Sequence, residues 1–166
     1  MVMALHPDPH RYGLAATSPW WSGATYMFLH ASFIHLGMNL WVLHQLLRHV
    51  SWKGLAAAFA TGALIPGFCL TAAPTVGMSG ALFAAIGMMW YKFRDFRRSQ
   101  AYFCALIALG FAAWALGAPV NPFVHIWCYA IGFIIGILTK PSWKVGDNCL
   151  KKTRGVAAKG AGCSTR

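Results

Sequence analysis

Apolar residues in this chain run in long stretches, and most of the polar positions fall between them. Five such stretches can be drawn, at 24–47, 54–73, 77–91, 100–118 and 123–139. Each approaches the ~20 residues that a helix needs to cross a hydrocarbon core of ~30 Å, although the third is short. A helix also satisfies its own backbone hydrogen bonds in lipid. The pattern therefore predicts an all-α, polytopic membrane bundle with five transmembrane helices.

Composition and charge support this interpretation and orient the chain. Hydrophobic residues make up 58% of the 166 residues and charged residues only 10%, against roughly 25% charged residues in a soluble domain. Basic residues follow the first, third and fifth stretches, whereas the connections at 71–76 and 118–122 carry none. By the positive-inside rule, the basic loops and the C-terminus are expected in the cytoplasm and the N-terminus outside. We expect a multi-pass protein of the cell's inner or plasma membrane.

The charge pattern also divides the chain into three parts. Residues 1–23 are predicted to form an extracytoplasmic loop, 24–139 the transmembrane domain, and 140–166 a basic, disordered cytoplasmic tail. The tail lacks interleaved aromatic residues, so we expect it to attract anionic lipid and not nucleic acid. The five cysteines show no paired spacing, which predicts neither a disulfide nor a metal site.

Depth in the membrane can be counted from the basic residues that mark the cytoplasmic boundary. Ser79 precedes Lys92 by 13 residues, which puts it ~20 Å above that boundary. The same count puts His35 at ~20 Å and His125 at ~22 Å. Asn39 lies one turn below His35 on the same helix face. Polar groups from three helices are therefore expected at one depth.

Each of these polar residues also has a purely structural interpretation. Ser79 lies between Gly77 and Gly80, and small residues often pack helices together in membranes. His35 and Asn39 could form interhelical hydrogen bonds, and His125 could be a structural histidine beside a glycine-lined crossing. The shared depth favours a functional site, because ionisable groups inside membranes are usually functional. Three further histidines are interpreted as structural or interfacial: His30, His44 and His49.

At three places the sequence resembles the rhomboid family of intramembrane serine proteases. The stretch FLHASFIHLGMNL (28–40) is similar to the His-x-x-x-Asn second helix of that family, GMSGALF (77–83) to its Gly-x-Ser-Gly fourth helix, and HIWCYAIGFIIG (125–136) to its sixth helix. The resemblance covers about 20–139 and implies that the family's first helix is missing here. Two positions depart from the family pattern: Phe83 replaces a frequent Tyr, and Cys128 a frequent Gly.

The chemistry can be derived from the residues themselves. A serine hydroxyl needs a base to become a nucleophile, and His125 lies at about the depth of Ser79 on another helix. The three carboxylates, Asp8, Asp95 and Asp147, lie outside the predicted spans, so we expect a dyad and not a triad.

Several neighbouring groups are expected to assist this dyad. The backbone N–H of Ser79 and the side chains of His35 and Asn39 would stabilise the oxyanion. Gly77, Gly80 and Phe83 are expected to line the approach of the substrate, with the two glycines letting its backbone come close. The family resemblance implies that the ring of Phe83 stacks on the catalytic histidine.

The predicted activity is cleavage of transmembrane segments of other membrane proteins near their extracytoplasmic end, without a metal or other cofactor. The absence of Glu excludes a His-Glu-x-x-His zinc protease, and the absence of Asp from the spans excludes an aspartyl-type intramembrane protease. Two alternatives stay open: a non-catalytic rhomboid-like protein that binds membrane helices, and a haem or ion-conducting bundle using His30 and His44. The oligomeric state is not predicted.

Overall fold

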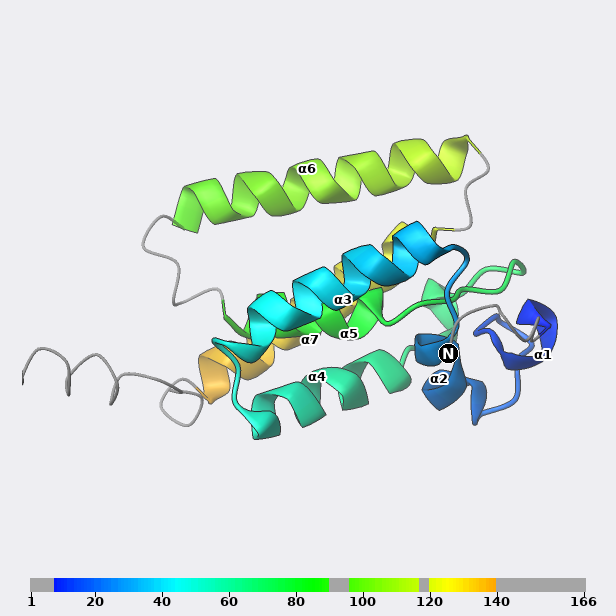
Figure 1. Ribbon diagram of the computed structural model, residues 1–166, viewed down its shortest axis with the longest axis horizontal. Helices are drawn as coiled ribbons and strands as arrows, with labels where there is room; N and C mark the ends of the chain where they lie inside the picture. The colour runs from blue at the N-terminus through cyan, green and yellow to red at the C-terminus, as the bar shows by residue number, and fades with distance from the viewer. Residues whose placement is uncertain (1–7, 90–95, 117–119, 140–166) are drawn as a thin grey trace, which may run out of the picture.

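The computed structural model describes residues 8–89, 96–116 and 120–139, and in these ranges the protein is built from helices (Figure 1). A single antiparallel bridge joins Leu14 to Thr75. The elements follow in the order α1 (Pro9–Tyr12), α2 (Ser22–Thr25), η2 (Tyr26–Phe28), α3 (Phe33–Leu47), α4 (Trp52–Ala63), η3 (Gly67–Cys69), α5 (Ser79–Met88), α6 (Phe96–Ala115) and α7 (Pro122–Leu138). The all-α class predicted from the sequence is observed throughout the described residues.

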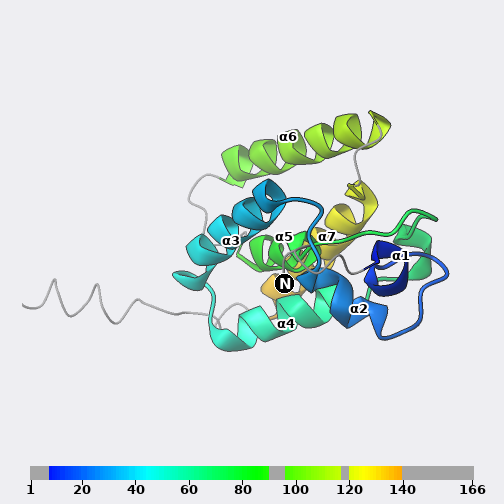
Figure 2. The same ribbon diagram turned by 45° about the vertical axis from the view of Figure 1, so that its right-hand side comes forward.

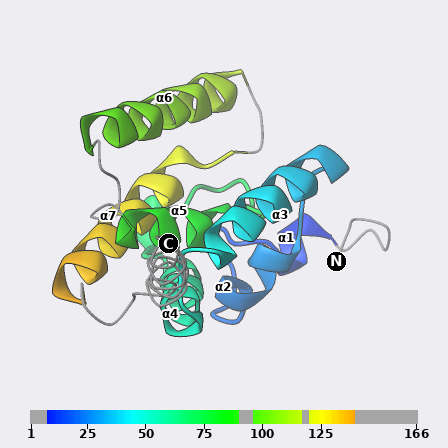
Figure 3. The same cartoon turned by 60° about the vertical axis from the view of Figure 1, so that its left-hand side comes forward.

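Helix α5 is the centre of the bundle. It contacts α3, α4 and α7, which surround it in the views of Figures 1 and 3. Seven of its ten residues are buried: Gly80, Ala81, Leu82, Ala84, Ala85, Gly87 and Met88. A helix that is apolar on every side is stable when other helices cover it on every side, and this explains why α5 carries no polar stripe.

The backbones of helices α5 and α7 are in contact where the two helices cross, because glycines line the crossing. A Cβ atom at Gly132 would collide with the carbonyl oxygen of Ala84, and one at Gly136 would lie 2.6 Å from the carbonyl oxygen of Met88. On the opposite side, a Cβ atom at Gly87 would collide with the carbonyl oxygen of Tyr129. Small residues on both helices therefore hold α5 and α7 closer than side chains would permit.

The first predicted stretch, 24–47, is not one continuous helix. Residues Ser22–Phe28 and Phe33–Leu47 meet at a bend of 99°. The backbone becomes extended at Leu29, and Ser32 then starts α3 by accepting a hydrogen bond from the N–H of His35 (3.1 Å). A serine before an apolar run favours a helix start, and the prediction of one span over 24–47 is wrong at this point.

This bend also removes the premise of the haem alternative. His30 lies in the break and is buried, whereas His44 lies on α3, is exposed, and pairs with Nη2 of Arg48 at 3.0 Å. The two histidines therefore do not share one helix face.

The other predicted stretches agree with helices in place, but the second and third are longer than the helices α4 and α5 that they contain. Helix α4 ends at Ala63, well before residue 73, because Pro66 restricts the residue before it and donates no backbone hydrogen bond. Among the described residues, no single helix is both long and apolar enough to cross a membrane, although the bent pair Ser22–Phe28 and Phe33–Leu47 passes that test together. The count of five spans stays a prediction.

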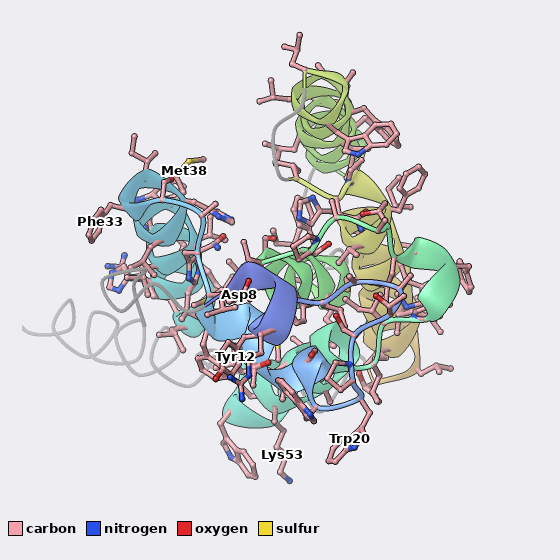
Figure 4. All side chains as sticks on the ribbon, turned by 90° about the vertical axis from the view of Figure 1, so that its right-hand side faces the viewer. Asp8, Tyr12, Trp20, Phe33, Met38 and Lys53 are labelled. Carbon is pink, nitrogen blue, oxygen red and sulfur yellow. The ribbon has the colours of Figure 1, made fainter. Side chains whose placement is uncertain are left out.

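Helix α6 lies at the edge of the bundle, with its main contact on α7 (Figure 2). Apolar side chains also point away from the core elsewhere, as Phe33 and Met38 do on α3 in Figure 4. Outward-facing apolar surfaces of this kind suit a hydrocarbon environment. The predicted basic tail, 140–166, lies outside the described residues.

Candidate active site

Ser79 and His125 meet across the α5–α7 crossing. Ser79 is the first residue of α5, and His125 lies in the first turns of α7. Ser79 Oγ is 2.8 Å from His125 Nε2, which is hydrogen-bond distance. Both side chains are partly buried. This arrangement lets a neutral imidazole accept the hydroxyl proton as the oxygen attacks a carbonyl carbon.

The ring of Phe83 holds the face of the imidazole. The centroids of Phe83 and His125 lie 4.5 Å apart, with 26° between the ring planes. Phe83 follows Ser79 by one helical turn, so the nucleophile and the stacking ring project from the same face of α5. Stacking limits rotation of the imidazole and keeps Nε2 directed at the serine.

The turn before Ser79 brings the α3 side chains against this site. Gly77 has φ +113°, a conformation that favours glycine. A Cβ atom at Gly77 would lie 2.7 Å from His35 Cε1 and 3.4 Å from Asn39 Nδ2. The absence of a side chain at Gly77 therefore lets His35 and Asn39 lie directly over the chain that leads to the nucleophile.

Asn39 presents an unused donor to this region. It is 6% exposed, and within the described part of the chain its Nδ2 is buried without a hydrogen-bond partner. Buried amide groups are nearly always paired in folded proteins, so an unpaired one calls for an explanation such as binding or catalysis. A carbonyl oxygen that becomes negatively charged beside Gly77 would accept this hydrogen bond.

The start of α5 lacks a side-chain cap. Met78 occupies the N-cap position and makes no side-chain capping hydrogen bond, whereas Ser32, Ser51 and Asn121 cap α3, α4 and α7. The first N–H groups of a helix attract negative charge. The first N–H groups of α5, that of Ser79 included, therefore have no side-chain cap from Met78.

Comparison with known proteins supports the family that these motifs indicated. A model of the Rhomboid domain matches residues 17–142, which is most of the chain. The chain belongs to the rhomboid family. As a rhomboid it is an integral membrane protein.

One curated relative of this rhomboid is the RHOMBOID-like protein 9, chloroplastic, of Arabidopsis thaliana. The two are 25% identical over 179 aligned positions, which cover 95% of this chain and 41% of the relative. The chain thus spans about two fifths of the length of the curated relative it matches. No solved structure matches the chain significantly.

Gly80 was expected to let the substrate backbone approach, but its surroundings in this rhomboid are different. It is buried, and a Cβ atom there would lie 3.0 Å from the hydroxyl of Tyr26, 3.3 Å from Cys128 Sγ and 3.3 Å from Val124 Cγ1. Gly80 therefore faces protein and not a surface that a substrate could approach. Its missing side chain makes room for Cys128, so Gly80 accommodates the departure from the family pattern at that position.

Tyr26 is a residue of the site region that sequence reasoning missed. Its backbone oxygen accepts a hydrogen bond from the N–H of Gly77 (2.9 Å), and its hydroxyl donates to the carbonyl oxygen of Gly62 on α4 (2.8 Å). Its side chain is fully buried. Tyr26 thus fixes the turn that presents Ser79, and no short sequence motif indicated this role.

His30 also lies closer to the site than its structural interpretation implied. It is 2% exposed, and its ring meets that of His35 edge to face, with centroids 5.2 Å apart. His30 therefore packs behind a proposed oxyanion donor. Among the described residues, no three His, Cys or Asp side chains come together as a metal site requires.

Proposed function

We propose that this rhomboid is an intramembrane serine endopeptidase that cleaves transmembrane segments of other membrane proteins through a Ser79–His125 dyad. The observation that carries the proposal is the 2.8 Å distance between Ser79 Oγ and His125 Nε2. The stacked Phe83 ring and the unpaired Nδ2 of Asn39 support it. Rhomboid membership makes a membrane-embedded protein substrate the appropriate class.

In the acylation step, Ser79 Oγ attacks the substrate carbonyl carbon while His125 Nε2 takes the hydroxyl proton. The negative charge that forms on the carbonyl oxygen is stabilised by the backbone N–H of Ser79 and the side chains of His35 and Asn39. His125 then gives its proton to the departing amine nitrogen as the C–N bond breaks. Water then attacks the ester carbonyl carbon while His125 Nε2 takes a water proton. His125 returns that proton to Ser79 Oγ as the ester C–O bond breaks, which releases the carboxylic acid product and restores the serine.

We also propose the orientation expected from the charge pattern, with the basic connections in the cytoplasm and the site nearer the outer face. Substrates would then be cut near their extracytoplasmic end, after local unwinding exposes a peptide bond to Ser79. A reporter fused after Arg166 should report cytoplasm. A reporter that reports the outside at this position would refute the orientation.

The dyad is tested with a fluorophosphonate probe, which requires an activated serine, and with a model transmembrane substrate. The purified protein should label and cleave, whereas Ser79→Ala and His125→Ala should each lose at least about 10⁴-fold in cleavage rate. The double variant should be hardly worse than either single one, because the two groups act as a unit.

The control for these variants is His44→Ala, a histidine that is exposed on α3 and pairs with Arg48. It should label and cleave like the wild type. If the fluorophosphonate labelled His125→Ala at the wild-type rate, the dyad would be ruled out. Binding of transmembrane peptides by a wild type that neither labels nor cleaves would instead favour the alternative, a non-catalytic rhomboid-like binding protein.

A further inference from the structure

The two chain segments that carry Ser79 and His125 are joined by one buried amide, that of Asn121. Asn121 is 5% exposed. Its Oδ1 accepts hydrogen bonds from the N–H groups of Phe123 (3.1 Å) and Val124 (3.4 Å). Its Nδ2 donates to the carbonyl oxygen of Cys69 (2.9 Å) and to Oγ1 of Thr75 (3.3 Å). Both ends of the amide are therefore in use.

The accepting end of this amide fixes the start of α7. Asn121 is the N-cap of the helix and Pro122 its first residue, a combination that favours helix initiation. His125 follows the cap by four residues, about one helical turn. The position of Asn121 therefore determines where the backbone of His125 lies, and with it the position from which the imidazole extends toward Ser79.

The donating end holds the connection that leads to Ser79. Thr75 precedes Ser79 by four residues, and its backbone pairs with that of Leu14 through Leu14 N–H to Thr75 O (3.0 Å) and Thr75 N–H to Leu14 O (2.8 Å). Two residues later, the N–H of Gly77 donates to Tyr26 O. The amide of Asn121 thus attaches to a segment that is fixed at neighbouring points.

We propose that Asn121 is a positioning residue that sets the distance between Ser79 and His125, an inference that rests on the proposed function. A helix cap alone does not require asparagine, because serine and aspartate cap about equally well. Asparagine adds two N–H donors to its acceptor oxygen, and here the donors reach the segment that precedes the nucleophile. Loss of the donors would let the α5 and α7 ends of the site drift apart while α7 stays capped.

The test separates capping from bridging. Asn121→Ser keeps an acceptor for the cap and loses the amide donors, and we expect kcat to fall about 10-fold with KM within about 2-fold, because small misplacements of catalytic groups slow the chemical step. Thr75→Val, which removes one acceptor of the bridge, should lower kcat about 3-fold, and Thr75→Ser, which keeps the hydroxyl, should restore it.

The matched control is Ser51→Ala, which removes the cap of α4 by deleting the acceptor for the N–H of Gly54. It should lower the melting temperature and leave kcat unchanged, because α4 carries none of the proposed catalytic groups. A wild-type kcat in Asn121→Ser would overturn the proposal. An equal loss of kcat in Ser51→Ala would overturn it too, since general destabilisation would then explain the effect.

A second measurement does not depend on catalysis. Hydrogen exchange of the peptide 70–78 should be at least about 10-fold faster in Asn121→Ser than in the wild type, because local opening becomes easier when the segment loses its anchor. If the wild type has no activity but exchange rises, the proposed function fails and the anchoring role stands. Unchanged exchange would refute the anchoring role whether or not the protein is an enzyme.

Discussion

Helix α7 packs against α5 with backbone contacts, whereas α3 contributes only a few buried side chains to the region around Ser79. Six residues of α7 are buried, glycines among them, but only Asn39 and Leu46 are buried on α3. The proposed nucleophile and base therefore lie on the most closely packed pair of helices. The side chains proposed as oxyanion donors, His35 and Asn39, lie on a helix that is mostly exposed.

This difference suggests how each half of the site is made precise. The distance from Ser79 to His125 depends on the α5–α7 crossing, which close packing keeps from relaxing. The position of His35 depends on the glycine at position 77, where a Cβ atom would collide with its ring and would also touch Asn39. Changes to helix packing should therefore damage the Ser79–His125 pair most, whereas changes to single polar side chains should be the main threat to the oxyanion donors His35 and Asn39.

Among substitutions that test this difference between α7 and α3, the largest effect is expected from Gly132→Ala. The added Cβ would collide with the carbonyl oxygen of Ala84, so α7 must move away from α5 at a cost of about 1–3 kcal/mol. Total activity should fall at least about 10²-fold, because the dyad separates. Thermal unfolding and substrate cleavage in detergent measure the two consequences.

The control is Gly37→Ala on the exposed side of α3, where a Cβ atom would meet nothing within 4 Å. It should keep full activity and gain slightly in stability, since alanine favours a helix. If Gly37→Ala were as damaging as Gly132→Ala, the contrast between the two helices would be wrong.

An intermediate effect is expected from Asn39→Ala. Turnover should fall roughly 10²-fold, because an oxyanion donor is lost. Labelling of Ser79 by a fluorophosphonate should persist, since the dyad is intact. Met38→Ala, which changes the neighbouring residue on the outer side of α3, should behave like the wild type. Wild-type turnover in Asn39→Ala would assign Asn39 a structural role only.

The smallest effect is expected at the stacking ring. Phe83→Leu should lower kcat about 2- to 10-fold, in line with the ~0.5–1.5 kcal/mol of an aromatic pair. Phe83→Tyr keeps the ring over His125 and should retain most activity. Equal losses in both variants would show that packing volume, and not stacking, is what the site needs at this position.

Part of this arrangement could be predicted from the sequence because depth in a membrane can be counted. The rise per residue from the basic loops put Ser79, His35 and His125 at one level, and the structure brings these side chains into one region. Their catalytic roles stay predictions. The break before α3 was also present in the sequence as the N-cap Ser32, but apolar residues on both sides concealed it.

Other features depend on tertiary contacts that no local pattern encodes. Gly80 accommodates Cys128, which lies 48 positions later in the chain, and the carbonyl oxygen of Tyr26 holds Gly77, 51 positions later. The Asn121–Pro122 pair does signal a helix start. Its second use, as a donor to the segment before Ser79, becomes visible only when that segment is placed beside it.

The shortness of α5 has a consequence for where the proposed protease would cut a substrate. Ten residues make a helix ~15 Å long, about half of a ~30 Å hydrocarbon core, with Ser79 at one end. In the proposed orientation the other end faces the cytoplasm, so the length of α5 would fix the distance between Ser79 and the cytoplasmic surface. A substrate helix anchored at the cytoplasmic surface would present the same peptide bond to Ser79 in thin and thick bilayers. One anchored at the outer surface would present a bond shifted by the difference in thickness.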